Sequence, residues 1–493
     1  MVDINIQIHD KFSFELKTSF IAARQQVDND INEFSISTWI FVPNSLDINR
    51  VTYSKERFYR DTRSNVRLIT PVYALKDICC KSENSPATRL ERALEALAEN
   101  PDETHRLDDF AFEVRMFSSI FKSATRDRAS AIINETDDAK RVPMVNDFIA
   151  DCTEVKRCYR ALQTVIESHK NLPKDMVECF SFGDTFIGNI TDQYGYRLMR
   201  DIENRPAFKT LKPKLYDFVK KENDYKIAKG YSTLNQEDST NNYLVVMRRN
   251  ILKKFIESDL FLDTKKSKDG AWAEQMVYAF AAAISMIFAT IIAFTAQFHY
   301  GNFTTPLFIA LVISYAFKDR IKEIMRYYFS TQLDKKYFDS KRKLEIQRQK
   351  IGWTKESFGF VSEGKVPEKV MNIRKRTPLV EAENRVYNEK IMLYRKLVNL
   401  SAAKINRYKG YPFVGINDIT RFNLVNFVQK MDNASVPLYM PDEENGYVSF
   451  KGERVYALHL IIRCEGQESL YYRKFRLLLN REGIKEIVEI PES

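Results

Sequence analysis

The chain has 493 residues, of which 44% are hydrophobic and 29% charged, with 15 Gly and 15 Pro. This composition excludes a collagen-like or largely disordered chain, because those chains contain far more Gly and Pro or far fewer apolar residues. The formal net charge of +10 favours an acidic partner such as a lipid surface or a nucleic acid.

Strand patterns dominate the N-terminal segment. Apolar and polar residues alternate over residues 4–8 and again over 12–16, which predicts two strands joined by a tight turn. A third strand is predicted over residues 34–42, before a proline. Residues 54–66 begin with a serine that can cap a helix and then carry one helical apolar side. Residues 1–85 are therefore predicted to form a small β-containing subdomain.

The pattern becomes helical after this subdomain. Ser85 is suited to cap a helix that begins at Pro86, and apolar residues then recur at helical spacing. Gly183 and Gly188 give the nearest approach to a phosphate-binding loop, but no strand pattern precedes them. A helix break or close packing is the expected role of these two glycines. Residues 86–270 are predicted to be a helical region.

Two apolar runs follow, over residues 276–298 and 303–317. The first run has no charged residue over 23 positions, and a helix rising ~1.5 Å per residue crosses the ~30 Å hydrocarbon layer over that length. The second run spans roughly 22 Å at the same rise. Because the turn between the runs is short, an antiparallel return is expected. Residues 271–317 are predicted to form a transmembrane helical hairpin.

Small side chains recur every fourth residue on the first helix of this hairpin and at the same spacing on the second. They are Ala281, Ser285, Ala289, Ala293, Ala310 and Ser314. Small residues let helices approach closely in lipid, where dispersion and backbone contacts hold helices together. The stripe is predicted to be a helix-packing face. The packing partner is either the second helix of the same chain or another copy in a homo-oligomer.

The second helix is predicted to leave the bilayer as a charged stalk or linker helix over residues 318–350. Long basic side chains can extend to the headgroups, and tryptophan favours the membrane interface. The residues expected at the lipid interface are Trp272, Lys318, Lys322, Arg326, Lys341, Arg342 and Lys343. The last three form a basic cluster that either contacts anionic lipid headgroups or belongs to a solvated linker.

Lysine and arginine are concentrated beside the apolar runs. Residues 245–270 hold seven Lys and Arg against four Asp and Glu, and residues 318–350 hold eleven against five. Basic flanks remain on the cytoplasmic side, so a multi-pass protein of the plasma (inner) membrane with both termini cytoplasmic is predicted. Nucleic-acid binding is disfavoured because no binding motif accompanies the charge. The N-terminus has no apolar signal-peptide core, and the hairpin itself is expected to direct insertion.

The C-terminal segment returns to strand patterns. Alternating or strand-like stretches occupy residues 391–400, 416–428, 456–464, 471–479 and 484–490. The last three of these predict a three-stranded meander. Residues 351–493 are predicted to form an autonomous β-rich cytoplasmic domain. The expected fold is therefore an α+β membrane protein, with a transmembrane hairpin between a mainly helical N-terminal domain and this C-terminal domain.

The sequence assigns no catalytic residue, cofactor or metal. The common phosphate-binding loops are absent, the five histidines are scattered, and the six cysteines include no Cys-x-x-Cys pair. Three functions stay open. The first is a membrane-anchored scaffold, sensor or regulatory protein with a protein partner, and the second is an oligomeric membrane effector gated by its soluble domains. The third is an enzyme whose site lies in residues 1–260 and matches no motif.

Overall fold

A computed structural model describes residues 2–22, 31–169, 171–347, 349–386, 388–406, 408–466 and 469–491. The protein is α+β, with about 53% helix and 27% strand. It divides into two compact units. We call residues 1–66, 263–405 and 415–493 the sheet unit, and residues 67–262 with 406–414 the helical unit.

Strands dominate the sheet unit. They are β1 (Val2–Asp10), β2 (Ser13–Ile21), β3 (Ile31–Val42), β4 (Thr62–Leu68), β5 (Asp263–Ser267), β6 (Ser340–Ile346), β7 (Gln349–Val361), β8 (Lys390–Ser401), β9 (Gly415–Asn423), β10 (Ser435–Asp442), β11 (Gly446–Glu453), β12 (Tyr456–Glu465), β13 (Leu470–Asn480) and β14 (Gly483–Ile490). The helices are α1 (Lys55–Asp61), α8 (Ala271–Tyr300), α9 (Thr305–Lys336), α10 (Glu368–Arg374), α11 (Pro378–Val386), α12 (Ala402–Asn406) and α13 (Val425–Val428).

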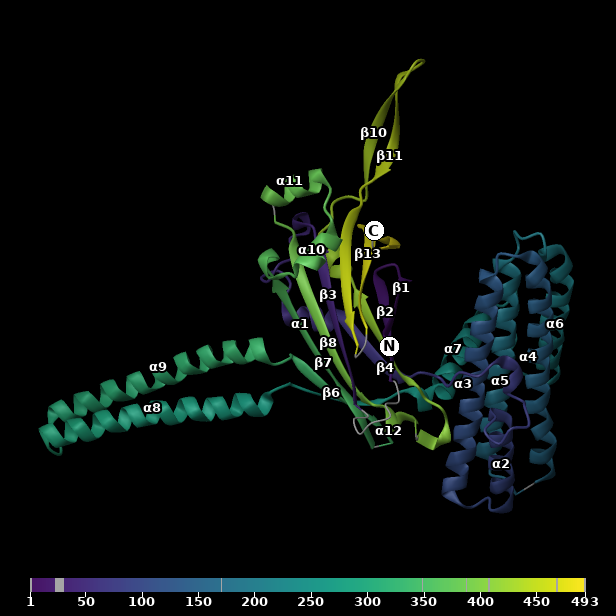
Figure 1. Ribbon diagram of the computed structural model, residues 1–493, viewed down its shortest axis with the longest axis horizontal. Coiled ribbons are helices and arrows are strands. Elements are labelled where there is room, and N and C mark those ends of the chain that lie inside the picture. The colour runs from purple at the N-terminus through teal and green to yellow at the C-terminus, as the bar shows by residue number, and fades with distance from the viewer. Residues whose placement is uncertain are drawn as a thin grey trace. The chain divides into compact units, whose positions relative to one another are not determined.

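An eight-stranded sheet forms the centre of this unit. Its strand order is β14-β13-β12-β3-β8-β7-β6-β5, beside a four-stranded sheet of order β1-β2-β9-β4 and a two-stranded ribbon of β10 and β11 (Figure 1). Strand β3 pairs with both β12 and β8, so an N-terminal strand lies in the middle of a sheet built mostly from C-terminal residues. Strand β9 pairs in turn with β2 of the four-stranded sheet.

The observed units differ from the domain boundaries expected from sequence. Residues 1–85 and 351–493 were expected to be separate domains, but their strands share both sheets and fall in one unit. The physical reason is that β3 is hydrogen-bonded through both of its edges, to β12 on one side and to β8 on the other, so it cannot be separated from the C-terminal strands without breaking the sheet.

Aromatic side chains fill the space between the two larger sheets. Phe58 of α1 stacks on Phe358 of β7 with ring centroids 3.8 Å apart, and Phe14 of β2 stacks on Phe422 of β9 at 4.9 Å. Tyr394 of β8 meets Phe422 edge-on at 5.9 Å. These contacts join the sheets across one core.

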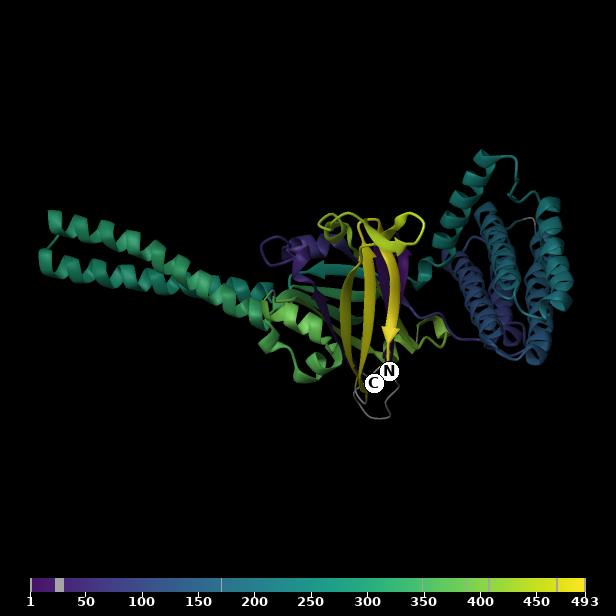
Figure 2. The same ribbon diagram turned by 90° about the horizontal axis from the view of Figure 1, so that it is seen from above.

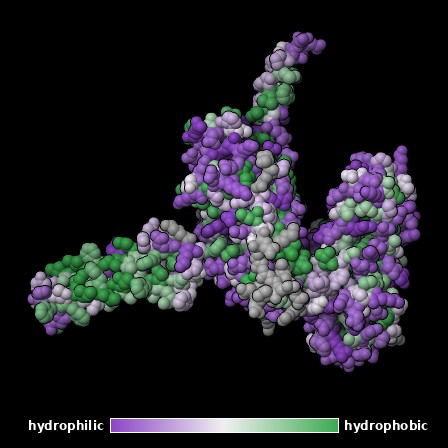
Figure 3. Space-filling model, in the orientation of Figure 1, coloured by the Kyte–Doolittle hydropathy of each residue, from purple (hydrophilic) through white to green (hydrophobic). Residues whose placement is uncertain are grey.

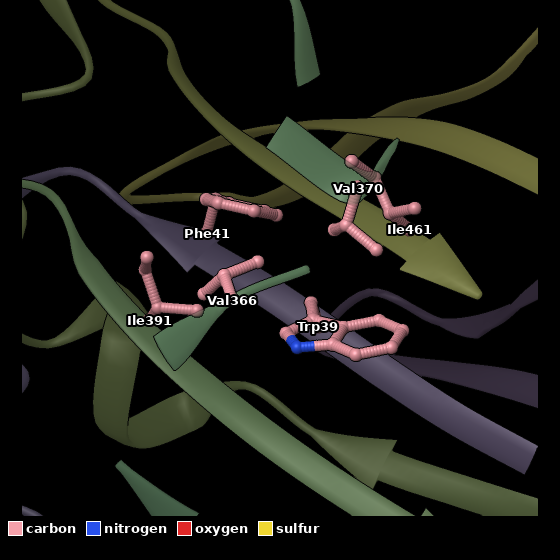
Figure 4. Close-up of a cluster of buried hydrophobic side chains, with 6 residues drawn as sticks. All are labelled: Trp39, Phe41, Val366, Val370, Ile391 and Ile461. Atoms are coloured by element: carbon pink, nitrogen blue, oxygen red, sulfur yellow. The ribbon is translucent and has the colours of Figure 1, made fainter. Parts of the chain in front are cut away.

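The opposite face of the large sheet is covered by α10. Trp39, Phe41, Ile391 and Ile461 project from the sheet toward Val366 and Val370 (Figure 4). All six residues are buried. Strand β3 therefore contributes alternate residues to two cores, with Ile40 facing the aromatic side and its neighbours facing α10.

Two local predictions are wrong. The helix expected over residues 54–66 is capped by Ser54 as predicted, but it ends at Asp61, and β4 begins at Thr62. Val66 and Leu68 alternate in burial and enter the four-stranded sheet. The helical stalk expected over 318–350 ends at Lys336, because the following residues extend the large sheet as β6.

The helical unit contains α2 (Pro86–Glu99), α3 (Thr104–Asn134), α4 (Asp138–Ser168), α5 (Lys174–Asp201), α6 (Phe208–Ala228) and α7 (Ser239–Ile256). Ser85 accepts a hydrogen bond from Thr88 N, so the predicted start of α2 is confirmed. Gly188 lies inside α5, where a Cβ atom would come within 2.6 Å of Glu222 Oε1. Close helix packing, as expected, is the role of this glycine.

Candidate membrane hairpin

Helices α8 and α9 continue directly from a pair of strands. Strands β5 and β6 are antiparallel neighbours at one edge of the large sheet, with Ser267 opposite Lys341. Figure 2 shows α8 and α9 running side by side from this strand pair. Because β5 and β6 are hydrogen-bonded, the chain enters and leaves the helical hairpin at the same edge of the sheet.

Asp269 fixes the chain where it enters α8. Its carboxylate accepts a hydrogen bond from Phe338 N at 3.3 Å and pairs with Lys355 of β7 at 3.0 Å. Asp269 is buried, so these bonds are shielded from water and are stronger than exposed ones. The residue ties the beginning of α8 to the end of α9 and to the sheet.

Asp339 fixes the chain where it leaves α9. Tyr59 OH donates to its carboxylate at 2.9 Å, Lys55 Nζ at 2.6 Å and Phe358 N at 2.8 Å. Burial and the Asp339 charge raise the pKa of Tyr59 far above its usual range, so its hydroxyl stays protonated and keeps donating. We call Asp269 and Asp339 with these partners the base joint.

Gly270 completes the base joint. Its φ of +70° is the left-handed conformation that favours glycine. A Cβ atom here would also lie 2.6 Å from the Tyr337 ring. A side chain at this position would therefore strain the backbone and displace the aromatic ring.

The small-residue stripe faces the second helix of the same chain. Ala281, Ser285 and Ser314 are buried, and Ser314 Oγ donates across the helices to the Ala289 carbonyl at 3.3 Å. Ala289, Ala293 and Ala310 are partly buried. Small side chains of both helices therefore lie in the contact between α8 and α9.

The outer sides of the two helices are apolar and exposed. Phe294 is 67% exposed, Phe298 87% and Phe308 67%, with other large apolar side chains on both helices between them. Figure 3 shows hydrophobic side chains covering much of this face of the hairpin. An exposed apolar surface of this extent requires lipid or another protein to cover it.

Length and composition distinguish the two helices. Among the described residues, α8 is the one helix that is long and apolar enough to cross a membrane. Helix α9 is longer than the second apolar run, but its uncharged part ends at Phe317 and charged residues follow from Lys318. The two-helix span therefore stays a prediction.

Two contacts show which residues of α8 and α9 lie side by side. Ser314 meets Ala289, and the Arg326 guanidinium lies 4.4 Å from the centroid of the Tyr278 ring. Interpolation in this antiparallel pair places Lys318 beside Ser285. The charged half of α9 accordingly lies against the first half of α8, in which Glu274 is the charged residue.

The residues expected at the lipid interface consequently lie at different levels. Trp272, at the start of α8, is thirteen positions from Ser285, which is about 20 Å along a helix. Lys322 and Arg326 lie between these two levels. The contact of these residues with lipid headgroups stays a prediction.

The basic cluster at 341–343 belongs to β6. Arg342 pairs with Glu356 at 3.4 Å and donates to the Ser64 carbonyl at 3.1 Å. Lys341 Nζ lies 5.3 Å from the centroid of the Trp353 ring, and Lys343 is exposed. Arg342 thus has structural partners within the sheet unit.

Sequence reasoning missed the base joint. Asp269 and Asp339 flank the apolar segment in the chain, but no spacing or motif marks them. Their role depends on β7 and α1, which only the tertiary fold brings to this edge. The described residues contain no group of three His, Cys, Asp or Glu that could hold a metal ion.

Comparisons with protein-family models, with curated proteins and with solved structures find no match for this chain. Inferences about its function therefore come from its own sequence and geometry.

The interhelical contact gives a direct test of the small-residue stripe. Replacing Ala281 with Leu adds bulk at a fully buried position, whereas the same change at exposed Ala283 does not. We expect Ala281→Leu to lower stability in detergent by about 1–3 kcal/mol, the usual range for overpacking. Ala283→Leu should leave the unfolding midpoint unchanged. Equal effects in denaturant titrations would argue against a close contact at Ala281.

Proposed function

We propose that the protein is a membrane-anchored scaffold or sensor whose α8–α9 hairpin inserts into a bilayer. The observation that carries this proposal is the exposed apolar surface of the hairpin, which has no cover within the described structure. In water such a surface is unfavourable by ~25 cal/mol per Å². Lipid removes this penalty without a protein partner.

The base joint supports placing all residues outside the hairpin on one side of the membrane. Strands β5 and β6 are paired, so the chain returns to the sheet from which it left. Both flanks of the hairpin are rich in Lys and Arg, and such flanks stay cytoplasmic. We assign both termini to the cytoplasmic side of the plasma (inner) membrane.

The levels of the two helices suggest how the hairpin meets the headgroups. Lys318, Lys322 and Arg326 have long aliphatic stems that can lie against apolar surface while their charges reach anionic headgroups. We place this basic side of α9 at the cytoplasmic headgroup layer. In this arrangement the start of α8, including Trp272, lies above the bilayer.

A rigid connection between hairpin and sheet favours a scaffold or sensor. Asp269 and Asp339 bind partners in α1, in β7 and in the segment just after α9. A displacement of the hairpin would therefore be transmitted to the large sheet rather than absorbed by a linker. The sheet unit would be held near the membrane in a defined orientation.

A second candidate function is an oligomeric membrane effector. Its support is the exposed pair of Arg320 and Glu323, 3.1 Å apart on α9 beside the uncharged part of α8. If the whole of α8 lay in lipid, these charges would need other copies of the hairpin to shield them.

Excising the hairpin tests membrane anchoring. Replacing residues 271–336 with a short Gly-Ser loop should leave β5 and β6 paired, because their ends are already adjacent. We expect the full chain in the membrane pellet after alkaline carbonate extraction, and the shortened chain in the supernatant with a cooperative thermal melt. Recovery of the full chain in the supernatant would contradict the proposal.

The same experiment separates the two candidate functions. The detergent-solubilised full chain should have the mass of a monomer, or of a complex with a different protein, if it is a scaffold or sensor. An assembly with the mass of several copies of the chain, which disappears when the hairpin is removed, would favour the effector.

A further inference from the structure

A polar groove of about 760 Å³ lies within the helical unit. Its walls come from α3, α5, α6 and α7, and residues 232–234 of the connecting loop border it. The volume falls in the range of ~300–1,000 Å³ that is usual for small-molecule sites. Both charged and aromatic side chains line it.

Four of its lining residues are cationic, and two of these have partners. Lys226 bonds to Asp192 and donates to Asn189 Oδ1 at 3.1 Å, while Lys122 bonds to Glu257. Burial raises the pKa of Asp192 and lowers that of Lys226, as expected for a pair held away from water. These two cations are already neutralised.

The other two cations are Arg249 and Lys253 on α7. Neither side chain has an ion-pair partner in the described part of the chain. Arg249 Nε is buried and has no hydrogen-bond partner among those residues. Because Arg249 and Lys253 are four residues apart on one helix, their side chains lie on the same face.

Asp192 is the carboxylate among the lining residues, and it offsets one of the four positive charges: Lys226 binds its Oδ2, while its Oδ1 has no hydrogen-bond partner among the described residues. The other nearby carboxylates are bonded behind the groove. Glu222 behind the groove is bonded to Lys156 at 2.8 Å and to Arg160 at 2.6 Å. Asp184 is bonded to Arg160 and accepts from Tyr225 OH. This network is internally balanced, so the excess positive charge stays on the groove.

The remaining lining suits a ligand with polar edges and a flat ring. Asn189, Gln193, Asn223 and Asn250 present amide donors and acceptors. Tyr196 lines the groove and is 57% exposed, which leaves a ring face open for stacking. These groups line the same groove as Arg249 and Lys253.

We propose that this groove binds a phosphate-bearing small molecule of about nucleotide size, with Arg249 and Lys253 pairing with its phosphate groups. Arginine binds phosphate through two parallel hydrogen bonds, and lysine adds a point charge. The amides and Tyr196 hold the rest of the ligand. This site does not depend on the membrane proposal, although a bound ligand would give a sensor its signal.

The probes are ATP and inorganic pyrophosphate, titrated calorimetrically into the full chain in neutral detergent at fixed ionic strength. We expect ATP to bind at least tenfold more tightly than pyrophosphate, because pyrophosphate lacks the ring and hydroxyl groups. Arg249→Gln and Lys253→Gln should each weaken ATP binding at least tenfold. The matched control is Lys254→Gln, which removes the same charge from the next, exposed residue outside the groove.

Three outcomes would overturn the proposal. The first is no ATP binding at millimolar concentration. The second is equal loss of affinity in Lys253→Gln and Lys254→Gln, which would indicate only diffuse charge attraction. The third is equal affinity for pyrophosphate and ATP, which would exclude a nucleotide-sized ligand. Because Lys253 is exposed, its variant should keep the wild-type melting temperature and remains informative if Arg249→Gln unfolds.

Discussion

Residues 351–493 expressed alone should fail to fold cooperatively, although their sequence pattern predicts an autonomous domain. Strand β3 lies between β8 and β12 in the intact sheet and carries Trp39 and Phe41 into the core under α10. Removing even one such aromatic side chain costs about 3–5 kcal/mol. Because the whole stability of a domain is about 5–15 kcal/mol, losing the strand should abolish folding.

Circular dichroism of the fragment during heating checks this expectation. The fragment should give a gradual loss of signal and bind a hydrophobic dye at room temperature. The matched control is the chain without the hairpin, which keeps β3 together with all residues outside 271–336. A cooperative melt of residues 351–493 alone would show that β8 and β12 can pair without β3 and would restore the separate domain.

Asp339→Ala should be among the most destabilising single changes in the sheet unit. The substitution leaves Tyr59 OH and Phe358 N without their acceptor in a largely buried place. Each unsatisfied buried donor costs about 1–3 kcal/mol. Lys55 adds little, since it is 41% exposed and can be solvated. We expect a total loss of about 3 kcal/mol in the free energy of unfolding.

Asp432 provides the control for this substitution. Its carboxylate also accepts bonds from a basic residue and a tyrosine, Arg454 at 2.7 Å and Tyr456 at 3.1 Å, but it is 67% exposed. Asp432→Ala should cost less than about 1 kcal/mol. Denaturant titration of both variants in detergent makes the comparison. Similar losses at the two positions would mean that the base joint adds no rigidity.

Membrane fractionation of Asp339→Ala separates the joint from the anchor. The exposed apolar surface of the hairpin is untouched by this change, so the variant should still sediment with membranes. The loss of stability in this variant should be confined to the connection between the hairpin and the sheet. Loss from the pellet would instead make the joint a requirement for insertion.

Local patterns determined much of the secondary structure. The period-two alternation after residue 455 predicted the meander that β12, β13 and β14 form. Ser85 and Pro86 predicted the start of α2 because capping depends on residues within one turn. The uncharged run 276–298 likewise lies within α8, since an apolar helix of that length needs no distant partner to be recognised.

Tertiary structure decided what is paired with what. No local pattern places β3 between β8 and β12, because its partners lie at least 348 positions away in the chain. Thr62 begins a strand instead of a further helical turn because β4 can join the four-stranded sheet. Asp339 acquires its role only when α1 and β7 meet the hairpin. Arg249 has no ion-pair partner among the described residues, because folding pairs Asp192 with Lys226 and Glu222 with Lys156. Periodicity and caps are set by neighbouring residues, whereas these pairings are selected by the free energy of the whole core.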